Sequence, residues 1–438
     1  MGNLPFSEVR SVHTEDIKNA ISSGRLDGYF LREYGKGASE AQKSRYLKAL
    51  DDFSSIFGGD RDVSVFSVGG RSEISGNHTD HNRGRVVAAA VSLDIIAVAS
   101  ARDDNIVRIK SEGFPEDVVD LDKYTAPVEE LFYTSGAIIA GVADGFRTRG
   151  FEAGGLDAYT VSDVKGGSGL SSSAAFEVMV GNMLNHFYNS GKVPAIEIAK
   201  ISQYSENRFF GKPCGLMDQT ACAVGGFVAI DFEDPENPKV TPLSFDLEKA
   251  GYSLCIVSPG GNHADLNDEY ASIPAEMKSV AGEFGKEVLK GLTEKDIFGK
   301  MPELRKKVGD RAVLRALHFI GEDRRAGELA EILSKGDIAR FLRSVSESGG
   351  SSFKYLQNVY QTKDAREEGL ALALKASEFF LEGTDYACRV HGGGFAGTIQ
   401  AFVPVETAER YREYMDALFG TGSCRKLSVR PDGAVRVI

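Results

Sequence analysis

Two periodicities run through the hydrophobic positions of this chain, and together they predict a protein that mixes helices with strands. Between residues 43 and 57 the apolar side chains recur every three or four positions, which predicts an amphipathic helix that ends at Gly58. Residues 63–71 alternate between apolar and small polar side chains and then run into glycines, as a short strand does. A second apolar strand is predicted at residues 86–100, so the polar residues 75–84 form a loop between two strands.

The middle and the end of the chain add elements of both kinds. We expect a helix near residues 128–146, a strand at 156–164, and a Gly/Ser-rich loop that opens a long amphipathic helix at 172–190. Large apolar side chains fall on one face of that long helix: Phe176, Met179, Val180, Met183, Leu184 and Phe187. The second half is richer in helix, with helices predicted at 311–333 and 365–383 and strands at 398–404 and 426–438.

The length of the chain favours two domains with a cleft between them. At 438 residues the chain is longer than a single hydrophobic core usually supports. We place the boundary near residue 245, which gives an amino-terminal domain of residues 1–245 and a carboxy-terminal domain of residues 246–438. The helices near the amino terminus are an extension of the first domain.

Composition narrows the possible functions. Charged residues make up 26% of the chain and hydrophobic residues 42%, as in a globular protein, and no apolar run is long enough to span a membrane. The amino terminus lacks a hydrophobic signal segment, so we expect a cytoplasmic protein without a membrane partner. The net charge of -12 argues against general binding to nucleic acid. The sequence does not determine the oligomeric state. The five scattered cysteines indicate reduced thiols rather than disulfides or a cysteine metal site.

The Gly/Ser-rich segment at residues 165–178, KGGSGLSSSAAFEV, has the chemistry of a phosphate cradle. Glycine lets the backbone approach a ligand closely, and a helix that starts among serines presents unpaired amide donors and the positive end of its dipole. A flexible linker is the competing interpretation, but a linker would not continue directly into a strong amphipathic helix. The segment lacks Gly-Lys-Ser/Thr after its glycines, which excludes the P-loop pattern.

The polar loop between the first two strands is the second candidate site. Arg71, His78, Asp80 and His81 crowd residues 70–84, and such a density of donors and acceptors beside apolar strands suits recognition of a sugar. Two other interpretations are a solvated turn and a hydrolase metal site with His78, Asp80 and His81 as ligands. Against the metal, the other histidines are isolated along the chain and no second cluster has ligand spacing.

Two further segments carry candidate chemistry. Asp218 lies in a stretch of apolar and small residues, 205–226, where a carboxylate is either a buried structural acceptor or a catalytic base. Gly392, Gly393 and Gly394 form a tight turn before a strand, which alone is weak evidence of a site.

In their order along the chain, these segments resemble the galactokinase family of the GHMP small-molecule kinases. The first family motif has the form G-R-x-N-[LI]-I-G-E-H-T-D-Y-N-x-G, and the matching positions are Gly70, Arg71, Gly76, His78, Thr79, Asp80, Asn82 and Gly84. The second motif, G-x-G-L-S-S-S-A-[AS], matches without a break from Gly167 to Ala175. CGLMDQ at 214–219 matches C-G-[IL]-M-D-Q, and GGGFAG at 392–397 resembles the third motif. Weaker similarity extends to residues 268–270, 315–318 and 430–434.

The resemblance implies a fold and a reaction. The fold is α+β, with a ribosomal-S5-like amino-terminal domain that has a left-handed crossover and a ferredoxin-like carboxy-terminal domain. The reaction is ATP-dependent phosphorylation of the C1 hydroxyl of galactose, with Asp218 facing that hydroxyl as general base or as electrostatic orienter. Arg71 would lie between this carboxylate and the transferring phosphoryl group, where its charge stabilises the transition state.

The same resemblance implies the binding residues. The triphosphate of ATP would be wrapped by Gly167, Ser168, Gly169, Leu170, Ser171, Ser172 and Ser173, with Gly393 added from the third motif. Mg²⁺ would be held by Ser173, or by Ser172, together with Glu206. The sugar would be held by Asn77, His78, Asp80, Gly215 and Tyr270.

The chain departs from the family pattern around the sugar. Asn77 stands where the family has a glutamate that contacts the 6-hydroxyl, and His81 replaces a tyrosine. A neutral amide would no longer repel a C6 carboxylate, and a protonated His81 would attract one. We therefore expect phosphorylation of galactose with weaker discrimination against galacturonate. Three other departures are Glu73 and Ser75 in place of Asn and Ile, Gly69 in place of Pro, and the lack of any Trp to pack on adenine.

Three other functions compete with a galactokinase. The nearest is a kinase of the same fold that acts on a C6-modified sugar such as galacturonate. A catalytically silent sugar sensor of this fold would lack the Ser-Ala step of the second motif, and Ser173-Ala174 is intact here. The metal hydrolase is the most distant.

Overall fold

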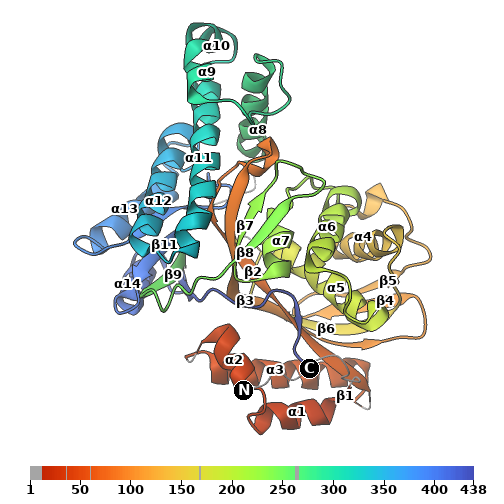
Figure 1. The fold of residues 1–438 in the computed structure, drawn as a ribbon. Coiled ribbons are helices and arrows are strands. Elements are labelled where there is room, and N and C mark those ends of the chain that lie inside the picture. Colours follow the sequence, from red (N-terminus) through yellow and green to blue (C-terminus); the bar gives the residue numbers. More distant parts are fainter. Residues whose placement is uncertain (1–11, 36, 60, 167–168, 262–265) are drawn as a thin grey trace.

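Two β-sheets form the frame of the protein, and helices cover their faces (Figure 1). The structure is a computed structural model that describes residues 12–35, 37–59, 61–166, 169–261 and 266–438. Within these residues the larger sheet has nine strands in the order β1-β2-β3-β6-β4-β5, with β13 paired to β2, β7 to β3 and β8 to β7. Its strands are β1 (Val12–His13), β2 (Asp62–Ser75), β3 (Arg85–Ala101), β4 (Ile106–Ser111), β5 (Glu116–Asp120), β6 (Leu156–Ser162), β7 (Phe227–Asp231), β8 (Lys239–Leu243) and β13 (Val435–Arg436).

The smaller sheet is antiparallel and comes from the second half of the chain. Its order is β10-β11-β9-β12, with β9 (Tyr252–Val257), β10 (Ala387–His391), β11 (Thr398–Pro404) and β12 (Cys424–Leu427). The helices are α1 (Thr14–Ser22), α2 (Asp27–Tyr34), α3 (Ser39–Phe57), α4 (Ser135–Thr148), α5 (Ser172–Asn189), α6 (Ala195–Ser205), α7 (Met217–Val224), α8 (Asn267–Gly282), α9 (Glu294–Gly299), α10 (Met301–Lys307), α11 (Asp310–Ser334), α12 (Ile338–Ser351), α13 (Gly369–Phe380) and α14 (Ala408–Phe419).

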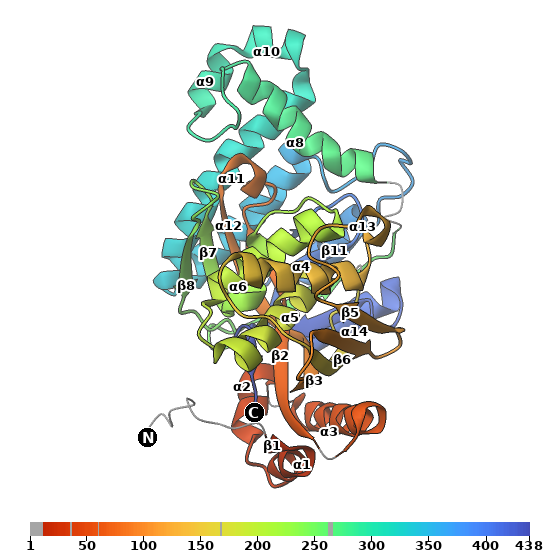
Figure 2. The ribbon, with the colours of Figure 1, turned by 90° about the vertical axis from the view of Figure 1, so that its right-hand side faces the viewer.

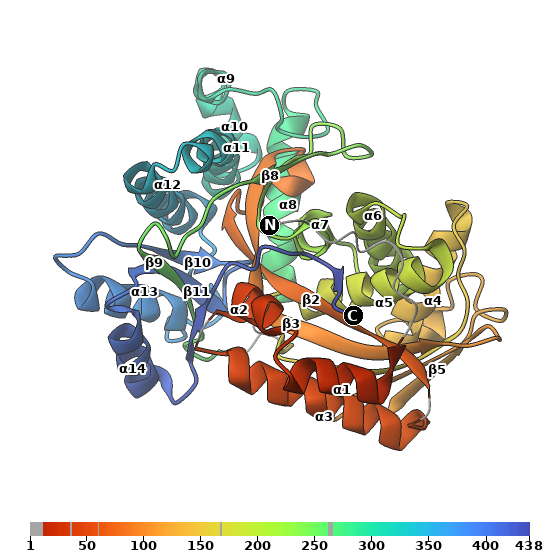
Figure 3. The ribbon, with the colours of Figure 1, turned by 60° about the horizontal axis from the view of Figure 1, so that its bottom comes forward.

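Alternation along β3 explains why the larger sheet is covered on both faces. Ala97 and Ala99 belong to the main core, which includes apolar side chains of α5, whereas Ile96 and Val98 pack with α1–α3. Successive side chains of a strand point to opposite faces, so α5 and α3 lie on opposite sides of the sheet. Figure 3 shows α1 and α3 spread across the face of β2 and β3. We call α1–α3 the amino-terminal cap.

The helical second half extends the molecule away from the cap. α8 packs against α11, and Figure 2 shows α8, α9 and α10 at the opposite end from α1 and α3. The main core is continuous between the two sheets, because Leu254 of β9 and Phe402 of β11 cluster with residues of the larger sheet. No helix in the described part of the chain is both long and apolar enough to cross a membrane.

Most expected elements are present, and for three of those that differ in their bounds the structure shows how they differ. β2 continues past its glycines to Ser75, with irregular pairing near Gly69–Arg71 and Glu73–Ser75. The helix expected from residue 128 starts at Ser135, because Thr134 caps it by accepting the amide hydrogen of Ala137. The strand expected at 426–438 is split into β12 and β13, since its Pro-Asp-Gly segment bends the chain between them.

Candidate functional site

Two adjoining cavities lie where the candidate segments of the sequence meet in space. The first has a volume of about 570 Å³ and is lined by the polar loop after β2, by residues 213–217 and by Tyr270. The second, of about 370 Å³, is lined by the Gly/Ser loop, the start of α5 and the glycine turn after β10. Arg71, Tyr270, Gly392 and Gly393 line both cavities, so the two spaces share one wall.

Arg71 of that shared wall forms a tight ion pair with Asp218, which lines the second cavity. Nε of Arg71 donates to Oδ1 of Asp218 at 2.6 Å, and Nη2 donates to Oδ2 at 2.7 Å. Ser171 adds a third hydrogen bond, from its hydroxyl to Oδ2 at 2.6 Å. Burial pushes the pKa of Asp218 up, but the Arg71 charge and these hydrogen bonds outweigh it and hold the pKa below its ordinary value. The carboxylate is therefore ionised and held in one orientation.

The Gly/Ser loop is anchored to the same arginine. The Gly169 carbonyl accepts from Nη1 of Arg71 at 2.6 Å, and the Leu170 carbonyl accepts the backbone amide hydrogen of Arg71 at 3.0 Å. Gly169 has a φ of +73°, and a Cβ there would meet Thr398 Oγ1 at 2.8 Å, so only glycine fits. Gly167 and Ser168 lie outside the described residues, whereas Ser171, Ser172 and Ser173 line the second cavity at the start of α5.

The second cavity has the donors that a polyphosphate needs. Lys165, Arg71 and Lys212 line it together with the amino-terminal end of α5. Cationic side chains and helix amides are the groups that bind phosphate oxygens in proteins. The residues present therefore fit the triphosphate of a nucleotide.

Ser173 and Glu206 come together as the sequence predicts. Oγ of Ser173 donates to Oε1 of Glu206 at 3.2 Å, and Nζ of Lys212 donates to the same oxygen at 3.0 Å. Two oxygen ligands beside a phosphate cavity fit Mg²⁺, which takes few protein ligands and fills its shell with phosphate oxygens and water. Lys212 is the cation that neutralises Glu206 in this arrangement.

Gln219 and Glu177 support Glu206 from the protein interior. Nε2 of Gln219 donates to Oε2 of Glu206 at 2.9 Å and to Oε2 of Glu177 at 3.1 Å. Burial, and then the nearby Glu206 charge, raise the pKa of Glu177 well above its ordinary value. The raised pKa favours the neutral form of the Glu177 carboxyl beside Glu206.

The predicted sugar residues line the first cavity. Nε2 of His78 donates to the Gly393 carbonyl at 3.1 Å, and the Tyr270 hydroxyl donates to the Gly394 carbonyl at 2.9 Å. Asp80 approaches Gly215 so closely that a Cβ on Gly215 would lie 2.1 Å from Oδ2. The glycine is therefore required by the position of Asp80.

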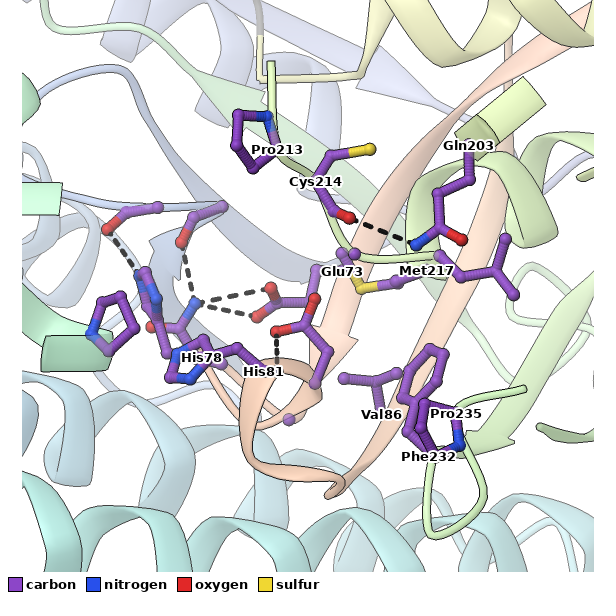
Figure 4. A pocket seen from close by; sticks show the side chains of 18 of the residues that line it. Glu73, His78, His81, Val86, Gln203, Pro213, Cys214, Met217, Phe232 and Pro235 are labelled. Atoms are coloured by element: carbon purple, nitrogen blue, oxygen red, sulfur yellow. Dashed lines mark hydrogen bonds between the residues drawn. The ribbon is translucent and has the colours of Figure 1, made fainter. Parts of the chain in front are cut away.

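Asn77 and Glu73 contact each other in the same wall. Nδ2 of Asn77 donates to Oε1 of Glu73 at 3.0 Å and to the Gly392 carbonyl at 2.8 Å. Oε1 of Glu73 also accepts from Arg389, at 2.9 Å. Figure 4 shows Glu73, His78 and His81 at one side of the cavity and the apolar Val86, Phe232 and Pro235 at another.

The suggestion that His81, if protonated, would attract a C6 carboxylate is contradicted by its burial. Desolvation, with His78 and His318 nearby, lowers the pKa of His81, so its ring is neutral at physiological pH. Instead of attracting an anion, the ring accepts a hydrogen bond of 2.9 Å from Nδ2 of Asn82.

Sequence patterns missed Lys212, Arg389 and Asn358. Lys212 carries a usable signal, since it is a cation two residues before the CGLMDQ motif. Arg389 lies 316 positions after Glu73, which it contacts, and Asn358 lies 281 positions after Asn77. No local pattern indicates such contacts.

Comparison with known proteins agrees with this arrangement. Residues 137–226 match the family described as GHMP kinases N terminal domain, and residues 51–101 match the galactokinase galactose-binding signature. The galactokinase of Streptomyces coelicolor is 31% identical over 362 residues, which are 81% of this chain and 88% of that protein. The galactokinase of Lactobacillus helveticus is 28% identical over 365 residues, which are 81% of this chain and 89% of that protein.

The solved structures show the same fold. The crystal structure of Lactococcus lactis galactokinase complexed with galactose superposes with a TM-score of 0.75 at 22% identity, covering 89% of this chain and all of that one. With its α+β architecture and its matched amino-terminal domain, the protein is a GHMP kinase by class. Within that class the chain belongs to the galactokinase family.

Proposed function

We propose that this protein transfers the γ-phosphoryl group of ATP to the C1 hydroxyl of galactose. The observation that carries the proposal is the Arg71–Asp218 pair at the wall shared by a phosphate-type cavity and a cavity lined with polar groups. A hydroxyl bound in the first cavity can there meet a phosphoryl group bound in the second. Galactokinase relatives over most of the chain support the same assignment.

Asp218 and Arg71 act on the reacting groups. Asp218 accepts a hydrogen bond from the C1 hydroxyl and orients it, and its low pKa favours this orienting role over early removal of the proton. Arg71 stabilises the charge that develops on the transferring phosphoryl group. The Ser171 hydroxyl fixes the Asp218 carboxylate relative to both.

The remaining predicted residues bind the two substrates. ATP would supply the phosphoryl group, and Mg²⁺ would neutralise charge on its phosphates. Ser173 and Glu206 are the proposed metal ligands. The proposed phosphate residues are Gly167, Ser168, Gly169, Leu170, Ser171, Ser172, Ser173 and Gly393, with Lys212 and Lys165 added by the structure. His78, Asp80, Gly215 and Tyr270 are proposed to form the sugar site, and Asn77 belongs to its wall. We also propose a cytoplasmic location, because the reaction consumes ATP.

An ADP-release assay with purified protein tests the proposal. Galactose, galacturonate, N-acetylgalactosamine, glucose and arabinose are each supplied with MgATP, and NMR of the product locates the phosphate. Galactose 1-phosphate as the main product supports the proposal. ADP release with galacturonate alone would favour the runner-up, a kinase for a C6-modified sugar, which Asn77 suggests. No sugar-dependent ADP release with any of the five would end the proposal.

A further inference from the structure

Glu73 is a buried carboxylate in the wall of the first cavity. The family motifs assign no catalytic or binding role to it. Its side chain is 6% exposed, and Oε1 accepts a hydrogen bond of 2.9 Å from Nη2 of Arg389, which is fully buried. Arg389 donates its other hydrogen bonds to the carbonyls of Ile74 and Val390, away from the cavity lining. A carboxylate held by a buried guanidinium is fixed in position.

Asn77 donates to the same carboxylate, and its other hydrogen bonds use the rest of the capacity of its amide group. One amide hydrogen goes to Glu73, and the other goes to the carbonyl of Gly392. Oδ1 of Asn77 accepts from Nδ2 of Asn358 at 2.8 Å and from the Ser352 hydroxyl at 3.4 Å. An amide has two donor hydrogens and two acceptor lone pairs, so Asn77 has nothing left for a sugar.

The acceptor that this wall still offers is Oε2 of Glu73. Among the described residues its one hydrogen-bond partner is Nδ2 of Asn77 at 3.4 Å, which is long for a hydrogen bond. A carboxylate oxygen accepts about two hydrogen bonds. Building on the proposed function, we infer that Glu73 accepts a hydrogen bond from a sugar hydroxyl and makes this cavity select neutral sugars over sugar acids. Asn77 is then a positioning residue that acts through Glu73.

The other ionisable groups around the cavity do not favour a sugar carboxylate. Asp80 brings a second carboxyl group to the lining, and the ring of His81 is neutral. The guanidinium of Arg71 is already bound by Asp218 through two hydrogen bonds. A sugar carboxylate would therefore meet the Glu73 charge at short range, which opposes binding. Asn77 alone suggests weaker discrimination against galacturonate. The carboxylate of its neighbour Glu73, in the same wall, reverses that expectation.

The test is Glu73→Gln, which keeps the shape of the side chain and removes its charge. The measured quantity is the ratio of kcat/KM for galactose to kcat/KM for galacturonate. We expect wild type to prefer galactose strongly and Glu73→Gln to lower the ratio about 10- to 100-fold, because a hydrogen bond to a charged acceptor is lost and the repulsion is removed. The 2-, 3-, 4- and 6-deoxygalactoses are assayed as well, and the variant should discriminate less against one of them.

Two further variants keep the test decisive. Glu73→Gln leaves Arg389 without a counter-charge, so Glu73→Gln with Arg389→Met is measured beside it, with thermal unfolding of both. Glu322→Gln is the matched control, since Glu322 is a buried carboxylate that accepts from Ser75 and Gly76 of the same loop but does not line the cavity. It should leave the sugar ratio unchanged even where it lowers the unfolding temperature.

The outcomes separate this inference from the proposed function. Wild type that phosphorylates galactose, with sugar and deoxy-sugar ratios unchanged in both Glu73 variants, overturns the role of Glu73 and leaves the galactokinase assignment in place. Equal shifts in the Glu322 and Glu73 variants also overturn it, because they would reflect the loop as a whole. If the wild-type protein shows no sugar-dependent turnover, the proposed function itself is refuted.

Discussion

Single residues in the site act in pairs, and the pairing decides what each can do. Asp218 would be a stronger base without Arg71, but then it would be free to rotate and its charge would be uncompensated. Pairing with Arg71 lowers the basicity of Asp218. It also fixes the orientation of the carboxylate and places a positive charge beside the phosphoryl group. Ser171, expected only at the phosphates, also binds Asp218.

Replacement of Asp218 by Asn should remove most of the activity. The amide keeps the shape of the side chain but can neither orient the hydroxyl as an anion nor accept its proton, so kcat should fall about 10²- to 10⁴-fold. Nucleotide affinity, measured by calorimetry with MgADP, should stay within a few fold of wild type. Near-normal turnover by a correctly folded variant would refute the placement of the reacting hydroxyl at Asp218.

Replacement of Lys212 by Met should weaken nucleotide binding. Lys212 lines the second cavity and donates to the oxygen of Glu206 that also contacts Ser173. Without this charge the phosphates meet Glu206 with less compensation, so affinity for ADP should fall about 10-fold or more, and Lys212→Arg should recover part of it. Calorimetry with ADP, with and without Mg²⁺, checks this. Unchanged affinity in Lys212→Met would limit Lys212 to a partner of Glu206.

Elements of the second half of the chain hold the polar loop in place. The sequence patterns did not predict these contacts. The loop between two strands and the helix after the Gly/Ser segment were predictable, because alternation and helical periodicity are local properties. The contacts from α11, β10 and Asn358 were not predictable, because they join residues far apart in the chain. His318 is an example: expected only as part of a weak motif, it donates from Nε2 to the carbonyl of Asn77 at 2.9 Å.

The buried His318 should make stability depend on pH. Burial lowers its pKa to about 4, from an ordinary value near 6.5, so the folded protein holds the ring neutral. The full contribution is present above pH 6.5, and it is lost as the pH falls from 6.5 toward 4, by about 2–3 kcal/mol. Urea unfolding at several pH values should show this loss in wild type and a smaller one in His318→Asn. Equal pH dependence in both would show that His318 does not titrate in this window.

At the scale of the whole molecule, one apolar core joins the two sheets, and a separate cluster joins the cap. The predicted boundary near residue 245 lies between β8 and β9, and it stays a prediction because the main core contains residues from both sides of it. β13 returns from the carboxy terminus to pair with β2, so the last strand belongs to the first sheet. The resemblance to a known family predicted the overall fold, whereas periodicity alone could not have paired the two ends of the chain.

A buried charge network fastens the cap to the sheet and to the carboxy-terminal segment. Asp94 of β3 is fully buried and accepts from Arg45 of α3 at 2.6 Å, from the Tyr34 hydroxyl of α2 at 2.6 Å and from Arg430 at 3.1 Å. Arg430 is itself buried against Gly69, where a Cβ would lie 3.0 Å from its Cδ. A proline at that position would meet the same obstacle, which gives a structural reason for this departure from the family pattern.

Replacement of Asp94 by Asn should therefore destabilise the protein without changing its chemistry. Burial alone would raise the pKa of Asp94, but the Arg45 and Arg430 charges outweigh it and lower the pKa, so the carboxylate is ionised and contributes to stability at neutral pH. Asn leaves the buried Arg430 and the mostly buried Arg45 without this counter-charge, and loss of one partner from such a network costs about 3–5 kcal/mol in the free energy of unfolding. Lys48→Met is the matched control, because Lys48 also reaches from the cap to the sheet region, through Glu112 next to β4, but its side chain is 61% exposed. An exposed pair is worth at most about 1 kcal/mol, so the control should unfold at nearly the wild-type urea concentration.

Turnover per folded molecule should be unchanged in both variants, since neither residue lines either of the two cavities of the site. Equal stability of Asp94→Asn and wild type would mean that the cap is held by its apolar cluster and not by the charge network.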